Sequence, residues 1–363
     1  MRVLYFSRDY TPHDHRFLAA LAESDHLIYY LRLERREHPL EERPLPQKID
    51  AVSWGGGQRP ASLIDAPGLF IGLKEVLRRI NPDLIHAGPI QSCAWLVALT
   101  GFHPLVSMSW GYDMMQDAER NALRGWMTRF TLQRSAMMIG DCEAVRNQAI
   151  RFGMERDRIV IFPWGVDLKQ FAPVNPSQQK SGRFTLLSVR AWEPVYGVDV
   201  IARAFVQVAR EHPNVVLVMI GAGSQTELIH DIFTKGGVLE RVSFPGQVSQ
   251  MALPNYYQIA DLYLSASHTD GSSVSLLEAM ASGCPAVVSD IPGNREWIQN
   301  DVNGWLFNDG DSDALAQAIL HAIEHRHDLA EMGLAARQVA EQRADWQKNF
   351  PKLIHAYERA VNS

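Results

Sequence analysis

The chain has 363 residues, of which 46% are hydrophobic and 21% are charged, a size and composition typical of a globular protein with more than one hydrophobic core. Its formal net charge of −6 excludes nucleic-acid binding driven by bulk electrostatics, because that binding requires an excess of cationic side chains. The first residues, MRVLYFSRDY, contain too short an apolar run for a signal peptide. No stretch reaches the ~18 apolar residues that cross a bilayer, so we expect a cytoplasmic protein.

The cysteines indicate a reduced protein without a structural zinc site. Cys93, Cys142 and Cys284 are odd in number and form no CxxC pair. Cys93 and Cys284 lie among small or apolar residues, so we expect them to be buried thiols in a reducing compartment.

Short apolar runs alternate with longer amphipathic segments through the first half of the chain. Apolar runs that end in loops predict strands, and apolar spacing at the helical period predicts helices between them. The predicted strands cover residues 3–7, 26–33, 51–54, 83–87, 104–110, 136–140 and 158–162, and the predicted helices cover 14–22, 68–80, 93–100, 117–134 and 142–152.

The predicted helix 117–134 is basic. Its cations are Arg120, Arg124, Arg129 and Arg134. We interpret them first as a solvated helix face, and the alternative is a patch that contacts lipid phosphates. In that alternative the amino-terminal domain binds peripherally to the inner face of a membrane.

The same alternation repeats after a break. Residues 163–183 contain three prolines and several polar residues without periodicity, which is typical of a linker. Alternating strands and helices indicate parallel sheets covered on both faces, so we expect two doubly wound Rossmann-like α/β domains. We place the first at residues 1–165 with a C-terminal helix at about 345–363, and the second at 166–344. The predicted strands of the second half cover 184–190, 214–221, 241–246, 261–267 and 285–290, and predicted helices cover 198–212 and 224–234.

The strongest chemical signal is the segment from Asp270 to Glu278. A strand ends just before it, a turn with the sequence Asp-Gly-Ser-Ser follows, and a helix begins near Val274. Glycine permits a close approach, and the N–H groups at a helix amino terminus attract anions. This turn therefore suits the phosphates of a nucleotide sugar, with two carboxylates to accept hydrogen bonds from its hydroxyls. The alternative is an ordinary turn followed by a capping box of Ser275 and Glu278.

This segment resembles the nucleotide-sugar motif of the family 4 glycosyltransferases. In that motif an acidic residue is followed, after seven residues, by a glutamate, then by Ala-Met-Ala and a small-Gly-x-Pro turn. Asp270, Glu278 and AMASGCPAVVSD match it, with Asp where Glu is usual. RIVIFPWGVDLKQFAP, YYQIADLYLSAS and IPGNREWIQNDVNGWLF also resemble segments of the family, in the same order. The resemblance implies the GT-B fold, in which two Rossmann-like domains face a cleft and a C-terminal helix crosses back to the first domain.

The resemblance also implies roles in donor binding and catalysis. Asp270 would contact the sugar hydroxyls, Glu278 the nucleotide ribose, and Arg190 the leaving diphosphate, whose developing charge a cation stabilises. The family carries an Arg and, about five residues later, a Lys; an ungapped match puts Ala191 and Tyr196 there, with Arg190 one residue early. Tyr196 can donate a hydrogen bond but carries no charge. The further donor contacts implied are Gly271, Ser272, Ser273 and Val274 beside the sugar and phosphates, and Gly246 and Val248 beside the base.

The amino-terminal domain would hold the acceptor. The loop after its first strand, SRDYTPHDHRFL, places Asp14 and His15 at the carboxyl end of that strand, where ligands of open α/β sheets bind; alternatively, Asp14 caps the first helix. His86 ends another strand and faces either the cleft or the core. In SWGYD, Trp110 stands where many relatives have His, and Asp113 is a candidate contact to donor or acceptor.

We therefore expect a retaining glycosyltransferase that moves a sugar from a UDP- or GDP-linked donor to a hydroxyl of a glycan, a lipid-linked glycan or a small metabolite. The donor is a substrate, so we expect no cofactor, and no DxD-type metal motif stands at a strand end. One alternative, motivated by Tyr196 and Trp110, is a non-catalytic relative that binds a nucleotide or a glycan. Another is a sugar-nucleotide epimerase or phosphorylase on the same fold.

Overall fold

The computed structural model of the chain describes residues 1–35, 41, 43–173 and 182–363. These residues form two compact units. Residues 1–162 and 350–363 make the first unit, and residues 163–349 make the second.

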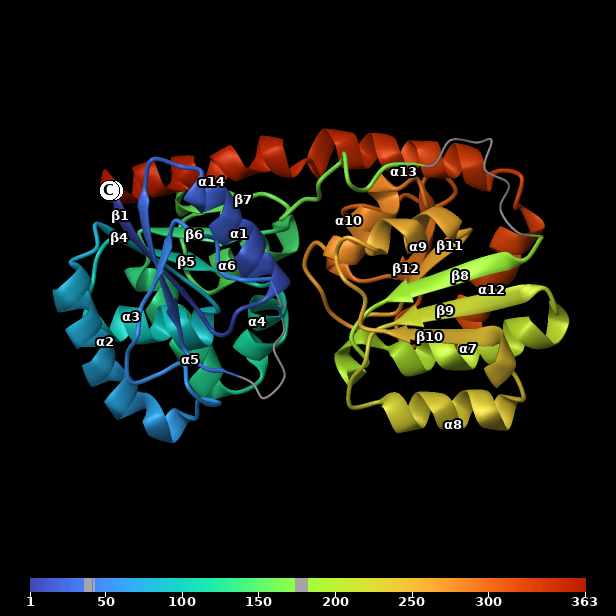
Figure 1. Ribbon diagram of the computed structural model, residues 1–363, viewed down its shortest axis with the longest axis horizontal. Coiled ribbons are helices and arrows are strands. Elements are labelled where there is room, and N and C mark those ends of the chain that lie inside the picture. The colour runs from blue at the N-terminus through green and yellow to red at the C-terminus, as the bar shows by residue number, and fades with distance from the viewer. Residues whose placement is uncertain (36–40, 42, 174–181) are drawn as a thin grey trace. The chain divides into compact units, whose positions relative to one another are not determined.

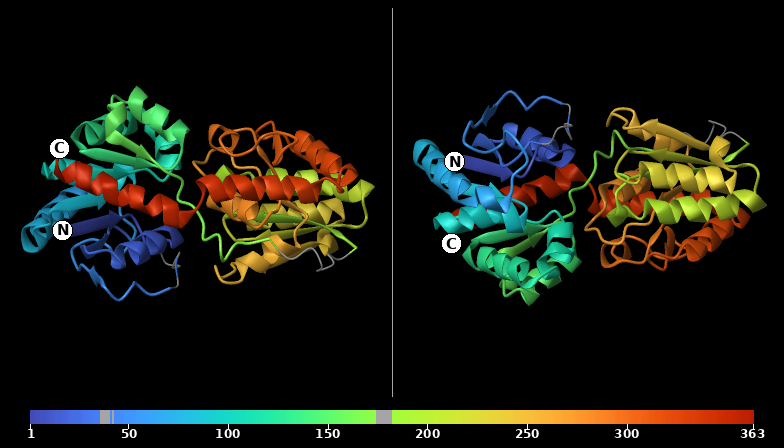
Figure 2. Two further views of the ribbon diagram at one scale, coloured as in Figure 1. Left: turned by 90° about the horizontal axis from the view of Figure 1, so that it is seen from above. Right: turned by 90° about the horizontal axis from the view of Figure 1, so that it is seen from below.

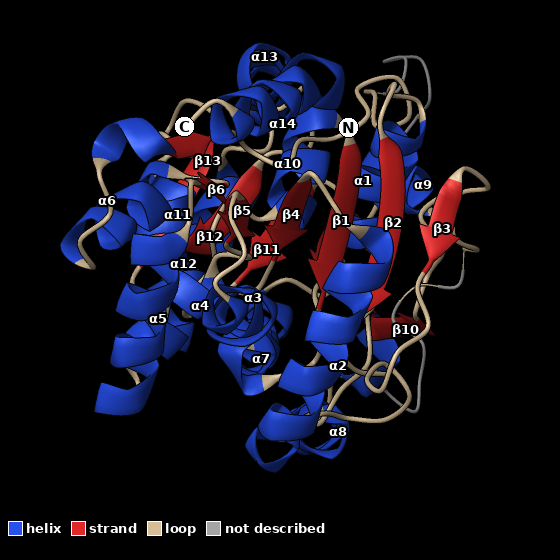
Figure 3. Ribbon diagram, turned by 90° about the vertical axis from the view of Figure 1, so that its left-hand side faces the viewer, coloured by secondary structure: helices blue, strands red, loops and turns tan. Residues whose placement is uncertain are grey.

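The described strands of the first unit form a seven-stranded sheet in the order β3-β2-β1-β4-β5-β6-β7, with every neighbouring pair parallel (Figure 3). In this register Val3 lies between Ile28 and Leu84. The strands are β1 (Arg2–Ser7), β2 (Leu27–Arg32), β3 (Ile49–Ala51), β4 (Leu84–Ala87), β5 (Leu105–Met108), β6 (Met137–Gly140) and β7 (Ile159–Ile161).

Helices cover both faces of this sheet, and the alternation of side chains along β1 shows why. Leu4 and Phe6 pack into a core with helices α2 and α3, whereas Tyr5 points to the opposite face, where its hydroxyl reaches Asp14 on α1. The helices of the first unit are α1 (Pro12–Ala22), α2 (Ala66–Ile80), α3 (Trp95–Thr100), α4 (Tyr112–Met115), α5 (Ala122–Arg134), α6 (Glu143–Arg151) and, across its C-terminal part, α14 (Trp346–Val361).

The C-terminal helix α14 packs against the first sheet (Figure 2). Its inward side chains, Leu353 and Tyr357, are fully buried. The Tyr357 hydroxyl lies 2.6 Å from Nδ1 of His86 on β4, which ties this helix to the centre of the sheet. The predicted return of the C-terminal helix to the first domain is therefore confirmed.

The second unit repeats the architecture with six parallel strands among its described residues, in the order β10-β9-β8-β11-β12-β13 (Figure 1). The strands are β8 (Phe184–Val189), β9 (Val215–Ile220), β10 (Val242–Gly246), β11 (Leu262–Ser265), β12 (Ala286–Ser289) and β13 (Gly304–Phe307). The helices are α7 (Val198–Glu211), α8 (Thr226–Gly236), α9 (Leu253–Ile259), α10 (Val274–Ala281), α11 (Pro292–Arg295), α12 (Ser312–Glu324) and α13 (Leu329–Arg343).

Two hydrophobic cores sandwich the second sheet. On β8, Leu186 packs into the core formed with α7, α8 and α12, and the next residue, Leu187, packs into the core formed with α9, α10 and α13. Strands buried on both faces explain the continuous apolar runs in the sequence. The predicted fold class, two doubly wound parallel sheets, is confirmed.

Three details differ from the sequence-based expectation. The predicted helix 117–134 breaks into a short turn and α5, because Asn121 caps the new helix by accepting a hydrogen bond from the Arg124 amide at 2.9 Å. The third strand begins at Ile49 and ends at Ala51, before Trp54, whose indole instead donates to the Arg32 carbonyl at 2.8 Å. A π-helical turn, Ile90–Ala94, precedes α3.

Further expectations concern the cysteines and the membrane. Cys93, Cys142 and Cys284 are all buried, as predicted for Cys93 and Cys284. Within the described part of the chain, no helix combines the length and the apolarity that crossing a bilayer demands. On the basic helix α5, Leu123 and Trp126 are half exposed, and the lipid-contact alternative stays a prediction.

Candidate functional site

The carboxyl ends of the parallel strands in the second sheet lie along one edge (Figure 1). Arg190 follows β8, Gly246 ends β10, and Asp270 lies in the loop between β11 and α10. This edge is where open α/β sheets bind their ligands. The fold therefore brings Arg190 next to Asp270, although the two residues are 80 positions apart in the sequence.

The loop from Asp270 to α10 is buried and tightly packed. A Cβ atom on Gly293, in helix α11, would lie 2.3 Å from the Gly271 carbonyl, so only glycine allows α11 to approach this loop so closely. The indole of Trp297 donates a hydrogen bond to the Ser272 hydroxyl at 3.1 Å. These contacts hold the loop in place just before Ser273, the extended residue that precedes α10.

Arg190 links the end of β8 to the loop before α10 by hydrogen bonds. Its Nη2 donates to the Asp270 carboxylate at 2.7 Å, and its Nη1 donates to the hydroxyls of Ser273 at 2.8 Å and Ser275 at 3.3 Å. The planar guanidinium matches these acceptors with two nitrogens at once, a geometry that a lysine ammonium does not offer. The cation and the carboxylate expected from the resemblance are therefore neighbours in the structure.

The surroundings of Arg190 stabilise the charged form of its guanidinium. The guanidinium stacks on the ring of Tyr196 with a centroid distance of 4.1 Å. Burial acts to lower the pKa of Arg190, but the attraction of Asp270 outweighs it and the pKa lies above its ordinary value. The Arg190 Nε is buried and has no hydrogen-bond partner among the residues that the structure describes. Tyr196 thus contributes a stacking surface, and the local positive charge comes from Arg190.

Glu278 lies one turn into α10 and its carboxylate is buried. Oε1 accepts a hydrogen bond from Gln250 Nε2 at 2.8 Å, and Oε2 accepts one from the Tyr257 hydroxyl at 3.0 Å. The same hydroxyl reaches the Ser275 carbonyl at 3.1 Å. Tyr257 therefore holds one carboxylate oxygen of Glu278 in position, and Gln250, which lies in a loop, donates a hydrogen bond to the other.

Sequence reasoning did not identify several residues of this network. Tyr257, Gln250 and Trp297 come from separate segments, and no local pattern marks them. Ser275 does not form the capping box considered as an alternative, since α10 begins after Ser273 with no side-chain cap. Its hydroxyl lies instead 2.7 Å from that of Tyr263 on β11.

The remaining predicted donor residues lie at or near the same edge. Gly246 has a positive φ of 74°, and its carbonyl accepts a hydrogen bond from Gly221 at 2.9 Å. Val248 packs against the core under α9 and α10. Val274 is the partly buried first residue of α10. Their contact with a nucleotide stays a prediction.

On the acceptor side, Asp14 is fully integrated into the fold. Thr11 caps α1, and Asp14, at the third position of that helix, completes a capping box with it, so Asp14 caps as expected in the structural alternative. The Asp14 carboxylate also accepts a hydrogen bond from Tyr5 at 3.0 Å. Burial raises the pKa of Asp14 to about 6. His15 lies at the surface of the same helix, with Nδ1 2.6 Å from the Tyr10 hydroxyl.

Of the two orientations considered for His86, the structure shows the one that faces the core. It is fully buried, with Nδ1 2.6 Å from the Tyr357 hydroxyl and Nε2 3.1 Å from Met108 Sδ. Burial lowers its pKa to about 3, so the ring stays neutral. Both nitrogens are engaged inside the first unit, which leaves none for a ligand.

Asp113 and Trp110 lie after β5. The buried Asp113 carboxylate accepts hydrogen bonds from the backbone of Ile90 and Trp110, each at 2.9 Å, and from the Ser109 hydroxyl at 2.6 Å. Its burial raises its pKa to about 6. These bonds make Asp113 an organiser of its loop, whereas the partly exposed Trp110 ring packs beside His13.

A small cavity beside the loop Gly55–Gly57 was not predicted from the sequence. This loop is fixed, because the Gly57 amide donates to the Leu33 carbonyl at 2.7 Å. Between it and the start of α2 lies a cavity of about 170 Å³, lined by apolar and polar groups that include Leu33, Leu69, Arg59 and Asp65.

Known proteins are similar to this chain over both of its units. The profile described as "Glycosyltransferase Family 4" matches residues 13–170, and the profile "Glycosyl transferases group 1" matches residues 173–339. The chain is 25% identical to a glycogen synthase of Mycobacterium tuberculosis, over 96% of this chain and 92% of the relative. It is 31% identical to a phosphatidyl-myo-inositol mannosyltransferase of Mycobacterium leprae, over 61% of this chain and 59% of that one.

Solved structures share the fold. A sucrose-phosphate synthase from Thermosynechococcus elongatus superposes with a TM-score of 0.83 at 16% identity, covering 99% of both chains. The Anabaena protein HepE, solved with UDP-glucose, superposes with a TM-score of 0.78 at 19% identity, again over 99% of both chains. Together the two profile matches span most of the chain, in the order that the structure places the two units. The chain belongs to the family 4 glycosyltransferases, enzymes of the GT-B fold that transfer a sugar from a nucleotide-sugar donor.

Proposed function

We propose that the chain transfers a hexose with retention of anomeric configuration, without a divalent cation in the reaction, and that its second unit binds the donor at Arg190, Asp270 and Glu278. The observation that carries this proposal is the hydrogen-bonded cluster of Arg190 with Asp270, Ser273 and Ser275 beside the start of α10. A cation next to helix N–H groups is suited to stabilise a leaving diphosphate. This supports charge neutralisation by the protein itself.

Each residue of the cluster has a distinct task in this proposal. The Glu278 carboxylate accepts hydrogen bonds from the ribose hydroxyls, with Oε2 held in position by Tyr257. Arg190 turns from Asp270 and the serine hydroxyls toward the diphosphate, whose charge is larger. Asp270, released from Arg190, accepts hydrogen bonds from the hydroxyls of the donor sugar. The acceptor hydroxyl then attacks the anomeric carbon from the face that the nucleotide leaves.

UDP and GDP are the two nucleotides that we consider first for the donor. HepE is described in complex with UDP-glucose, and two mycobacterial relatives, each 24% to 25% identical, are described as GDP-mannose-dependent. We therefore propose a UDP- or GDP-linked hexose. A thermal-shift comparison of UDP-glucose, GDP-mannose and ADP-glucose identifies the base, because only a nucleotide that binds the native state raises the unfolding temperature.

We place the acceptor at the carboxyl edge of the first sheet. The cavity between the Gly55–Gly57 loop and α2 lies beyond the ends of β2 and β3. It combines apolar walls, Leu33 and Leu69, with the polar groups of Arg59 and Asp65, which suits a polar acceptor with an apolar face.

The experiment that tests the proposal is donor turnover in the variants Asp270→Ala and Glu278→Ala. We expect loss of nucleotide release from the matching donor in both, with wild-type folding by circular dichroism. Asp231→Ala is the control, because Asp231 is a half-exposed carboxylate on α8 of the same unit. Wild-type turnover in both site variants would contradict the assignment of Asp270 and Glu278 to the donor site.

The second candidate function is a binding protein without turnover. The observation that favours it is the uncharged Tyr196 beside Arg190, which leaves the candidate site with fewer cations than the family pattern implies. Tight binding of UDP-glucose or GDP-mannose without any release of nucleotide would select this alternative.

A further inference from the structure

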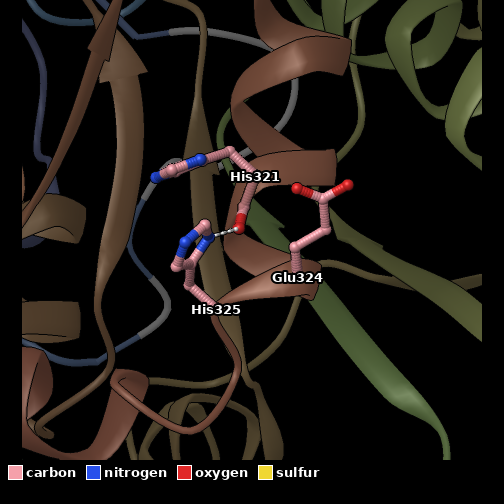
Figure 4. A group of neighbouring side chains, drawn as sticks. All are labelled: His321, Glu324 and His325. Atoms are coloured by element: carbon pink, nitrogen blue, oxygen red, sulfur yellow. Dashed lines mark hydrogen bonds between the residues drawn. The ribbon is translucent and has the colours of Figure 1, made fainter.

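Three side chains of types that can ligate a metal lie close together at the end of helix α12 (Figure 4). His321, Glu324 and His325 occupy positions i, i+3 and i+4, which share one face of a helix. The opposite face carries Ile319 and Ala322, which are fully buried. Because the opposite face of α12 is buried, these three side chains lie at the surface.

The geometry fits a chelating group. One ligand atom of each residue lies within 4.8 Å of those of the other two. Two imidazoles and a carboxylate form a ligand set that zinc prefers, at metal–ligand distances of roughly 2.0–2.2 Å. Because the histidines are exposed or half-buried and Glu324 is exposed, small rotamer changes can close the remaining gap.

Neighbouring groups hold both histidines. His325 Nδ1 lies 2.9 Å from the His321 carbonyl, an arrangement in which Nδ1 carries the proton and Nε2 keeps its lone pair. The His321 ring packs edge-on against Trp305, and its Nε2 lies 3.9 Å from Asp301 Oδ1. A carbonyl hydrogen-bonded to an imidazole typically orients it for metal binding, whereas the Asp301 carboxylate lies beyond hydrogen-bond distance of His321 and adds negative charge beside it. Trp305 Nε1 in turn fixes Asp301 Oδ1 at 2.8 Å.

The position in the helix adds electrostatic support. Residue 324 ends α12, and His325 is its C-cap. The last carbonyls of a helix lack intrahelical donors, and the macrodipole makes this end negative. A divalent cation is therefore favoured here.

The cluster is separate from the candidate donor site. Strand β13 ends at Phe307, and α12 begins at Ser312 and runs back along the sheet. Its end contacts Asp301 and Trp305 at the start of β13. The cluster thus lies at the amino edge of the second sheet, whereas Asp270 lies at the carboxyl edge.

We propose that His321, Glu324 and His325 form a surface site for one zinc ion, with Asp301 adding negative charge beside His321. The ion joins residues of the last turn of α12 to each other and, through His321, to the segment before β13. It takes no part in sugar transfer.

Isothermal titration of zinc chloride into the tag-free chain at neutral pH tests the proposal. We expect one zinc ion per wild-type chain, and at least about tenfold weaker binding in His321→Gln and in His325→Gln, because each variant removes a direct ligand. Glu324→Gln weakens binding as well. The matched control is His355→Gln, an exposed histidine of the first unit, which binds zinc like the wild type.

A second readout separates a metal site from general damage. Zinc raises the unfolding temperature of the wild type and of His355→Gln but not of His325→Gln, while all three have the same circular dichroism and the same donor turnover. The proposal is overturned if the wild type binds no zinc, or if His321→Gln and His325→Gln bind it as the wild type does.

Discussion

At the scale of single residues, the account depends on which groups hold the two acidic side chains of the candidate site. Asp270 is paired with Arg190, and Glu278 is held by Gln250 and Tyr257. The sequence marked the acids and the arginine because they lie in a recognisable motif. It did not mark Gln250 or Tyr257, because their role arises only when α9 and the preceding loop pack against α10.

Tyr257→Phe removes one hydroxyl and tests this arrangement. A hydrogen bond to a charged acceptor contributes about 1.5–3 kcal/mol, so we expect the KM for the donor to rise by roughly tenfold or more, with a smaller change in kcat. Steady-state kinetics with the matching nucleotide sugar measure both constants. Tyr256→Phe, on the same helix, keeps wild-type kinetics, and equal kinetics in the two variants would show that Tyr257 does not position Glu278.

At the scale of elements, the loops after the strands decide the chemistry, and the loop Gly55–Gly57 shows how. Continuous apolar runs predicted the strands, but the position of this loop and the cavity beside it were not predictable. They depend on two hydrogen bonds between distant segments, from the Trp54 indole to the Arg32 carbonyl and from the Gly57 amide to the Leu33 carbonyl. The break in the basic helix has a local cause instead: Asn121 caps α5 through the Arg124 amide three residues later, a signal that helical spacing alone does not reveal.

Filling the cavity tests its role in acceptor binding. Gly68, in α2, lines the cavity, and a Cβ atom there meets nothing within 4 Å, so the position accepts a side chain and Gly68→Leu places one beside the cavity. We expect the KM for the acceptor to rise severalfold while donor binding stays unchanged. Ile71→Leu, at an exposed position of the same helix, serves as the control. An unchanged acceptor KM in Gly68→Leu would place the acceptor elsewhere.

The link between β4 and α14 has a pH signature. Burial lowers the pKa of His86 from 6.5 to about 3, so between these values the unfolded chain binds a proton that the folded chain does not. This residue therefore makes the free energy of unfolding rise with pH, by up to ~1.4 kcal/mol per pH unit, and that stability is lost as the pH falls. Asp14, whose pKa is raised to about 6, acts in the opposite direction, so a difference measurement is needed.

Urea unfolding of the wild type and of His86→Gln between pH 4 and 6.5 isolates the contribution. We expect the free energy of unfolding of the wild type to rise more steeply with pH than that of His86→Gln. The control His355→Gln, which changes an exposed histidine, follows the wild type. Parallel curves for wild type and His86→Gln would contradict a buried neutral His86.

At the scale of the whole molecule, the repeated rhythm of strands and helices was enough to predict two parallel sheets, because strands buried on both faces leave continuous apolar runs. The rhythm does not contain the strand order, which places β1 and β8 inside their sheets. It is this order that brings Arg190, after β8, beside the loop after β11. The sequence therefore indicated that Arg190, Asp270 and Glu278 belong to one candidate site, but it did not predict their contacts.

The central claim is that Glu278 and Asp270 of the second unit bind a nucleotide sugar. Isothermal titration of UDP-glucose and of GDP-mannose into the wild type, Glu278→Gln and the exposed-helix control Asp231→Asn tests it most directly. We predict that one of the two donors binds the wild type and the control with equal affinity, and that Glu278→Gln binds it at least about tenfold more weakly, as expected for losing a charged acceptor. Equal affinity in Glu278→Gln and the wild type, or no binding of either donor to the wild type, would contradict the account.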